Sequence, residues 1–322
     1  CGSKLPIIGL IAGAIFGGSP WIAVSAYFIG IASVALSGII LKKLKAFAGE
    51  PAPFVMELPA YHITSIKNIL RAAWERGWSF IKRAGSVILI SSIIIWFFKS
   101  YGFVNGRFGN VEALFENKNV ATQEYKKELA DKRAVSMKDV NPMDASLLAS
   151  IGDTVSPIFK PLGFGNWKAT VATVTGLVAK EEVVGTFGIL YNYDDKDGDL
   201  EENGDQIWGR VAKDYTAASG MAFMIFNLLC APCFAAIGAI KREMNNAKWT
   251  WAAISWMTVW AYVLGVITYN LGALITGELS FGIGTVVSLV LTAGIIYLLV
   301  RKGYKAEDAP KTLSSVEAAG TK

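Results

Sequence analysis

Five apolar segments, separated by charged connections, run through this chain. They are residues 21–41, 84–101, 216–240, 249–275 and 281–300. A helix of about 20 apolar residues, rising 1.5 Å per residue, crosses the roughly 30 Å hydrocarbon layer of a bilayer. Only 18% of the residues are charged, against about 25% in soluble domains. The sequence therefore predicts an all-α, polytopic transmembrane helical bundle and argues against a water-soluble enzyme.

The charged residues collect near the ends of these segments. Residues 42–83 hold eight Lys/Arg against three Asp/Glu, whereas residues 191–215 hold three against eight. Basic flanks are retained on the cytoplasmic side of a membrane. The flanks at 42–45, 82–83, 241–248 and 301–305 therefore predict one cytoplasmic face that includes the C-terminus. The net charge of +5 is spread over these flanks, so it indicates orientation and not nucleic-acid binding.

Three further apolar segments contain helix-breaking or charged residues. Residues 145–162 and 167–191 are long enough to cross, but the first carries Asp153 and two prolines and the second carries a charged triplet. Neither can face lipid on all sides, yet the orientation above requires both to cross. Residues 7–16 supply about half a span before a Gly-Gly-Ser-Pro sequence, which predicts a broken or re-entrant half-helix.

The sequence also predicts helices and a tail outside the spans. Residues 64–83 carry apolar side chains on one face and basic ones on the other. That pattern fits an amphipathic helix in the headgroup plane, or a surface helix packed on the bundle, with Thr64 or Ser65 as its cap. Residues 125–135 are expected to form a charged external helix, and residues 306–322 a disordered tail.

The sequence Cys230-Ala-Pro-Cys233 lies inside an apolar segment. Pro232 has no N–H and its ring clashes with a preceding carbonyl, so a helix must kink or unwind here. Carbonyls freed at membrane depth persist only against protein or a polar cavity, and both thiols would share that cavity. Thiolate and carbonyl ligands suit a borderline or soft divalent metal rather than Mg²⁺ or Ca²⁺. Two alternatives stay open: packing of buried thiols and a redox pair, although no βαβ pattern surrounds the motif.

Three consecutive charged residues, Lys180, Glu181 and Glu182, interrupt another apolar segment. Each costs about 2.5 to 3.5 kcal/mol at the bilayer centre on insertion scales, so each needs a role or a partner. On a continuous helix the two carboxylates diverge by about 100°. One would then point into a cavity while the other pairs with Lys180 or another helix. A salt bridge that ties helices together is the alternative for either carboxylate.

Several weaker signals complete the picture. The only histidine, His62, is interpreted as an interfacial residue, and residues 195–201 as a solvated acidic loop, because their glycine and glutamate do not fit a calcium loop. No GxxxxGK[ST] motif occurs, so nucleotide energy would come from another domain. The chain begins at Cys1 without Met or a leader, and we expect it to start inside a longer protein. Residues 1–6 loosely repeat the pattern around Cys233, as in transporters built from two halves.

Together, motifs over nearly the whole chain resemble the ferrous iron transport protein B (FeoB) family. Those resembling its first gate and the region after it are residues 1–6, 56–61, 74–77 and 82–85. Those resembling its second gate are residues 157–165, 175–191 and 230–243. The family often has Cys-Pro-Cys where this chain has Cys230-Ala-Pro-Cys233, so the thiol spacing around the break differs.

The resemblance implies a bacterial inner-membrane importer of Fe²⁺, with an N-terminal GTP-binding domain that this chain lacks. Fe²⁺ would be the transported substrate, and GTP and Mg²⁺ would act only through the missing domain. The implied partners are the lipid bilayer, that GTPase domain, small accessory Feo proteins and further copies of the chain. By resemblance, Cys1, Cys230 and Cys233 are gate cysteines and Glu181 and Glu182 belong to an intramembrane acidic motif. These five residues are the predicted metal site.

We expect the chain to be the permeation part of a GTPase-coupled Fe²⁺ importer, without enzymatic activity of its own. The alternative is a gate-type membrane scaffold or a nucleoside carrier whose Cys and Glu residues are structural. An intramembrane enzyme ranks third. The sequence argues against it, because it has no Ser/His or metal–His cluster that could catalyse a reaction. The expected bundle has broken or re-entrant gate helices. Its expected parts are the end of the first gate (1–50), an amphipathic cytoplasmic interfacial helix (51–83), a transmembrane helix with an external loop (84–143), the second gate with broken helices (144–245), two transmembrane helices (246–300) and a disordered cytoplasmic tail (301–322).

Overall fold

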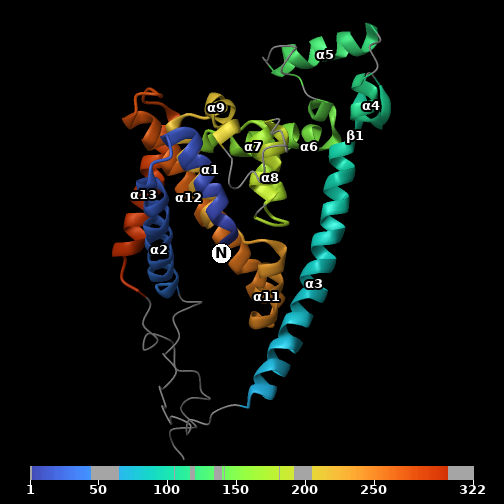
Figure 1. The fold of residues 1–322 in the computed structure, drawn as a ribbon. Coiled ribbons are helices and arrows are strands. Elements are labelled where there is room, and N and C mark those ends of the chain that lie inside the picture. The colour runs from blue at the N-terminus through green and yellow to red at the C-terminus, as the bar shows by residue number, and fades with distance from the viewer. Residues whose placement is uncertain are drawn as a thin grey trace, which may run out of the picture.

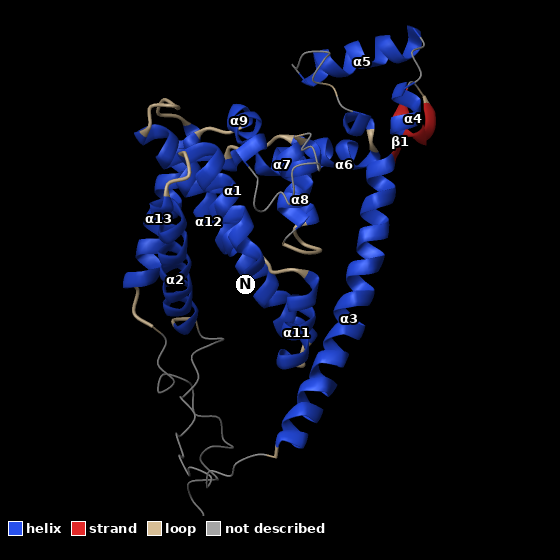
Figure 2. Cartoon of the chain, in the orientation of Figure 1, coloured by secondary structure: helices blue, strands red, loops and turns tan. Residues whose placement is uncertain are grey.

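Helices account for nearly all of the structure, and one β-hairpin is the exception (Figure 2). The computed structural model describes residues 2–44, 65–104, 106–116, 120–133, 140, 142–180, 182–191 and 205–303. The predicted all-α class is therefore confirmed. Cys1, Glu181, His62, the acidic loop 194–204 and the tail 306–322 lie outside the described residues.

The elements follow one another along the chain as labelled in Figure 1. The α-helices are α1 (Leu5–Phe16), α2 (Pro20–Lys42), α3 (Ile66–Ser100), α4 (Val111–Glu116), α5 (Val120–Arg133), α6 (Leu147–Val155), α7 (Trp167–Thr175), α8 (Glu182–Leu190), α9 (Asp205–Asp214), α10 (Ala217–Leu229), α11 (Phe234–Met244), α12 (Ala247–Ile275) and α13 (Ile283–Val300). Short 3-10 helices are η1 (Gly2–Lys4), η2 (Pro142–Ala145) and η3 (Ser156–Leu162), and the antiparallel strands are β1 (Tyr101–Val104) and β2 (Arg107–Asn110).

Three helices, α2, α12 and α13, are long and apolar enough to cross a membrane, among the residues that the structure describes. They correspond to three of the predicted spans. The indole N–H groups of Trp256 and Trp260 on α12 donate to the hydroxyls of Ser37 and Ser33 on α2, each at 2.7 Å. An indole N–H needs such an acceptor when it is removed from water, so these bonds fix how α2 packs on α12.

The two predicted helices at 64–83 and 84–101 form one continuous helix, α3, of 35 residues. No proline occurs within it, so nothing interrupts its backbone hydrogen bonds at residue 83. The prediction of a separate helix in the headgroup plane is therefore wrong. The basic pair at 82–83 lies within the helix and not at its end. At 1.5 Å per residue α3 is about 52 Å long, and it stands along the whole height of the molecule in Figure 1.

The predicted crossings at 145–162 and 167–191 are each divided into short pieces. The first consists of α6 and η3, because Pro157 and Pro161 provide no N–H for a longer helix. The second consists of α7 and α8, with nine residues each. The broken helices predicted for the second gate are therefore confirmed, whereas the crossing of the two segments stays a prediction.

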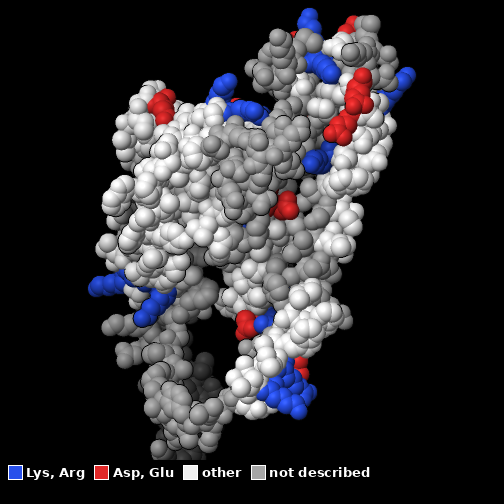
Figure 3. Space-filling view, viewed as in Figure 1, with Lys and Arg blue, Asp and Glu red and all other residues white. Residues whose placement is uncertain are grey.

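The half-helix and the proline break are as predicted. α1 ends at Gly17, whose φ of 60° is left-handed, and α2 begins after it at Pro20. The helix containing the cysteines is interrupted between α10 and α11. The basic ends of α2, α11 and α13 and the start of α3 lie at one end of the molecule, where Figure 3 shows basic side chains near the bottom of the view.

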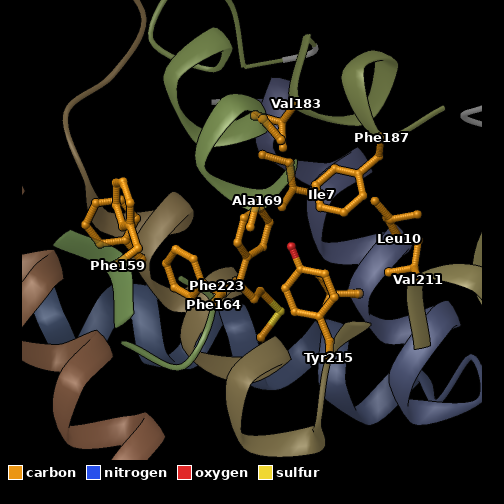
Figure 4. Packing of buried hydrophobic residues seen from close by; sticks show 14 of the residues in the cluster. Ile7, Leu10, Phe159, Phe164, Ala169, Val183, Phe187, Val211, Tyr215 and Phe223 are labelled. Atoms are coloured by element: carbon orange, nitrogen blue, oxygen red, sulfur yellow. The ribbon is translucent and has the colours of Figure 1, made fainter. Parts of the chain in front are cut away.

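The core lies where α1 packs against α8, α9 and α10. Its centre is a group of aromatic rings that pack edge to face, including Phe164 on Phe223 and Phe187 on Phe223, with centroids 5.1 and 5.5 Å apart (Figure 4). A second, smaller cluster joins the hairpin to α4 and α5. α5 includes most of the charged helix predicted at 125–135, whereas the hairpin was not predicted.

A tight approach at Gly163 generates a prediction about stability. Its φ is +81°, and an added Cβ would lie 2.1 Å from a ring carbon of Tyr269 on α12. Gly163→Ala should therefore cost about 2 kcal/mol or more through backbone strain and overpacking. We expect a lower melting temperature in detergent, followed by tryptophan fluorescence. Gly38→Ala is the matched control, since an added Cβ meets nothing within 4 Å there. Equal melting temperatures of the two variants would contradict this account.

Candidate ion site at two helix breaks

Two interrupted helices meet inside the molecule. One is interrupted at residues 230–233, between α10 and α11, and the other at the described residues 176–180, between α7 and α8. The backbone N–H of Phe234 donates to the carbonyl of Leu177 at 3.0 Å. The first amide of α11 therefore finds its partner in the other break, so each break supplies a group that the other needs.

The sequence around Pro232 explains the first break. Pro232 offers no N–H to the carbonyl of Leu228, and both Cys230 and Cys233 have extended backbone conformations with ψ of 171° and 163°. α10 ends at Cys230, and a new helix begins after Cys233. The predicted unwinding at this motif is confirmed, and it leaves carbonyls at the end of α10 without helical partners.

The two thiols lie in different surroundings. Cys230 is 4% exposed, whereas Cys233 is half-buried, and both are free thiols. Cys230 and Pro232 line a cavity of about 560 Å³ between α2, α12 and the break. Cys233 is not among the residues that line it. The walls are mostly apolar, with Trp249, Trp256 and Trp260 on one side. We expected both thiols to face one cavity. Cys230 lines this cavity, and Cys233 does not.

Lys180 lies in the second break and is 1% exposed. Its Nζ donates to Cys230 Sγ at 3.2 Å. The predicted pairing of Lys180 with a neighbouring carboxylate is not found in the part of the chain that the structure describes, because the break turns its side chain to Cys230. Lys180 thus joins the two breaks through a side chain, as the Phe234 N–H does through the backbone.

Glu182 is the first residue of α8 and is exposed. The prediction for Glu181 and Glu182 assumed one continuous helix, whereas the described residues 176–180 lie between α7 and α8. Glu181 itself lies outside the described residues. A carboxylate at a helix start is stabilised by the positive end of the helix dipole. Glu182 is therefore accounted for as a helix-start residue, and the structure does not bring it to Cys230.

Two polar groups that were not predicted as site residues also lie at the end of α10. Lys4 Nζ donates to the carbonyl of Leu228, and Asn227 is fully buried one turn before Cys230. The side-chain oxygen of Asn227 has no hydrogen-bond partner within the described residues. A signal in the sequence could have identified Asn227. It is a polar residue within an apolar segment, and it lies three positions before Cys230, on the same face of a helix.

The described residues contain no group of three or more His, Cys, Asp or Glu side chains that could hold a metal. The acceptors gathered at the break are instead a thiol, main-chain carbonyls and an amide oxygen. Such a set binds a divalent cation weakly, with a preference for softer ions from the sulfur. The arrangement is suited to a transient ion position and not to a closed structural metal site.

Comparison with known proteins agrees with these features. A family model described as "Ferrous iron transport protein B C terminus" matches residues 23–76, and a gate model described as "Nucleoside recognition" matches residues 81–247. The chain is 32% identical over 278 residues to an Fe(2+) transporter FeoB of Methanocaldococcus jannaschii, covering 85% of this chain and 36% of that protein. It is 29% identical over 372 residues to the Fe(2+) transporter FeoB of Escherichia coli K12, covering 100% of this chain and 44% of that protein.

A third relative is a fusion of Fe(2+) transport protein A and Fe(2+) transporter FeoB from Porphyromonas gingivalis. It is 30% identical to this chain over 284 residues, and the alignment covers 85% of this chain and 33% of that protein. The chain spans less than half the length of these relatives. No solved structure matches it significantly. The gate model covers more than half of the chain, and FeoB relatives align over 85% to 100% of it; the chain belongs to the ferrous iron transport protein B (FeoB) family.

Proposed function

We propose that this chain forms the permeation part of an Fe²⁺ importer, with the ion passing the break at residues 230–233. The observation that carries the proposal is Cys230, a buried thiol beside unwound backbone where two interrupted helices cross. The names of the relatives, which are Fe(2+) transporters, support Fe²⁺ as the transported substrate.

The chemistry of the break suits a partly dehydrated Fe²⁺. Sulfur favours Fe²⁺ over the hard ions Mg²⁺ and Ca²⁺, which prefer oxygen ligands. Affinity alone does not reject Zn²⁺ or Cu²⁺, which bind nitrogen and sulfur ligands more tightly. Selection against them would therefore come from geometry or from metal supply. Cys1, Cys233, Glu181 and Glu182 are proposed as further positions along the same path.

The membrane orientation also belongs to the proposal. Basic residues at the ends of α2, α11 and α13 lie at one end of the molecule, which supports a cytoplasmic C-terminus in a bacterial inner membrane. We retain the six-part division given above, except that the expected interfacial helix joins the following transmembrane helix within α3.

The energy source would lie outside this chain. Because the relatives are more than twice its length, a GTPase domain that uses GTP and Mg²⁺ would belong to the rest of the protein, and this part would have no enzymatic activity. The fusion to Fe(2+) transport protein A in one relative supports a small accessory partner. Further copies of the chain are the other proposed partner.

A second candidate function is nucleoside transport, which the description of the gate model favours. In that case the thiol and carboxylate side chains would only pack and pair. Anaerobic titration of the full-length protein distinguishes the two, because a nucleoside carrier binds a nucleoside such as uridine and shows no thiol-dependent Fe²⁺ binding.

Replacing both thiols tests the proposed path. Cys230→Ser with Cys233→Ser should lower Fe²⁺ uptake by the full-length protein about ten-fold or more, because a hydroxyl is a harder and poorer ligand for this ion than a thiolate. Uptake is measured as ⁵⁵Fe accumulated under anaerobic conditions. Thr292→Ala is the control, since Thr292 only bonds within α13. Unchanged uptake in the double variant, at equal protein level, removes the thiols from the mechanism.

The different burial of the two thiols gives a second prediction. In a Cys1→Ser background, a protein retaining only Cys233 should react with maleimide about ten times faster than one retaining only Cys230, because access limits the buried thiol. The rates are measured by mass spectrometry in detergent. Denatured protein, in which both thiols are open, supplies the reference rate. Equal rates in the folded protein would mean that Cys230 is not enclosed as described.

A further inference from the structure

Two lysine ammonium groups occupy acceptors beside the break at 230–233. Lys180 Nζ donates to Cys230 Sγ at 3.2 Å, and Lys4 Nζ donates to the carbonyl of Leu228. The two lysines come from distant parts of the chain: Lys4 ends the turn before α1, and Lys180 belongs to the break before α8. Their acceptors lie two residues apart at the end of α10. Two independent cations therefore converge on one short stretch of unwound backbone.

Among the described residues, no carboxylate forms an ion pair with the buried Lys180 or the half-buried Lys4. Lys180 is 1% exposed. A buried ammonium carries a large desolvation penalty unless charges or dipoles compensate it. Here the compensation comes from a sulfur and a carbonyl oxygen, which are the atoms that a soft divalent cation would use.

A further buried acceptor, on the residue three positions before Cys230, lacks a donor among the described residues. The amide nitrogen of Asn227 donates to Phe223 O at 3.1 Å, whereas its oxygen has no partner among the described residues. Asn227 is fully buried, and its main-chain carbonyl accepts from the Cys230 thiol at 3.7 Å. A buried acceptor without a donor is unfavourable unless a cation or water binds it. The end of α10 therefore offers more acceptors than the protein itself fills.

We propose that Lys4 and Lys180 are tethered cations that occupy the ion position of this break, so that a divalent cation must displace them to bind. When Fe²⁺ reaches Cys230 Sγ and the neighbouring oxygens, it takes over the acceptors while both ammonium groups withdraw. The inference rests on the proposed function and adds two residues that set the affinity of the site.

This arrangement meets a need of ion transport. An ion must bind well enough to enter and weakly enough to leave. A tethered competitor has a high effective concentration, so it lowers the apparent affinity for the ion and refills the site as the ion departs. Removing one tethered cation should therefore tighten Fe²⁺ binding instead of weakening it.

The test is anaerobic calorimetric titration of Fe²⁺ into the full-length protein in lipid nanodiscs, without nucleotide. Lys180→Met removes the ammonium and keeps a long side chain, and we expect about ten-fold tighter binding. Lys180→Arg keeps the charge and should bind Fe²⁺ like the unchanged protein. Combining Lys180→Met with Cys230→Ser should abolish the gain, because the released acceptor is then lost.

Lys4→Met is the second variant and should also bind Fe²⁺ more tightly. If Lys180→Met shows no cooperative thermal unfolding and is therefore misfolded, Lys4→Met alone tests the role of the tethered cations. Unchanged or weaker Fe²⁺ binding in the folded lysine variants, with thiol-dependent binding intact in the unchanged protein, overturns the role of the tethered cations alone. Equal Fe²⁺ binding by the unchanged protein and by Cys230→Ser with Cys233→Ser instead overturns the proposed function, and the present inference with it.

Discussion

Backbone groups that leave a helix at membrane depth need partners inside the protein, and this requirement shapes the centre of the molecule. The hydrogen bond from Phe234 N–H to Leu177 carbonyl satisfies one such group by joining two breaks. The donor in one break bonds to the acceptor in the other. If either segment became a regular helix, it would leave the backbone group of the other segment without its partner. The segment between α7 and α8 is thereby joined to the first residue of α11, and Lys180 Nζ lies within hydrogen-bonding distance of Cys230 Sγ.

The same requirement explains why charge is tolerated here. In a bilayer core an ammonium is retained only where it meets acceptors or serves a function. Lys180 and Lys4 meet the first condition, since they bond to acceptors at the end of an interrupted helix. The acidic residue Glu182 needs no such explanation, because it begins α8 and is exposed. The chemistry of the break therefore depends on sulfur, oxygen and ammonium groups more than on carboxylates.

Long periodic segments and prolines were predicted well. The apolar lengths of α2, α12 and α13 fixed their extent, and Pro232 fixed the position of a break, because both effects are local. Broken helices were predicted for the second gate, but the position of the break after α7 was not, since its bonding partner Phe234 lies more than fifty positions away. For the same reason the partner of Lys180 could not be read from its neighbours. The continuity of α3 was missed because a change from an amphipathic to an apolar pattern does not show whether one helix ends and another begins.

The unbroken course of α3 has a mechanical consequence. The helix contacts α11 in its lower part and α6 and the hairpin at its upper end. A rigid rod held at two places behaves as a lever, so a shift of α11 as the thiol segment rearranges would tilt α3 as a whole. The hairpin at its far end would then move with it, linking the interior of the bundle to its outer surface without any change in secondary structure.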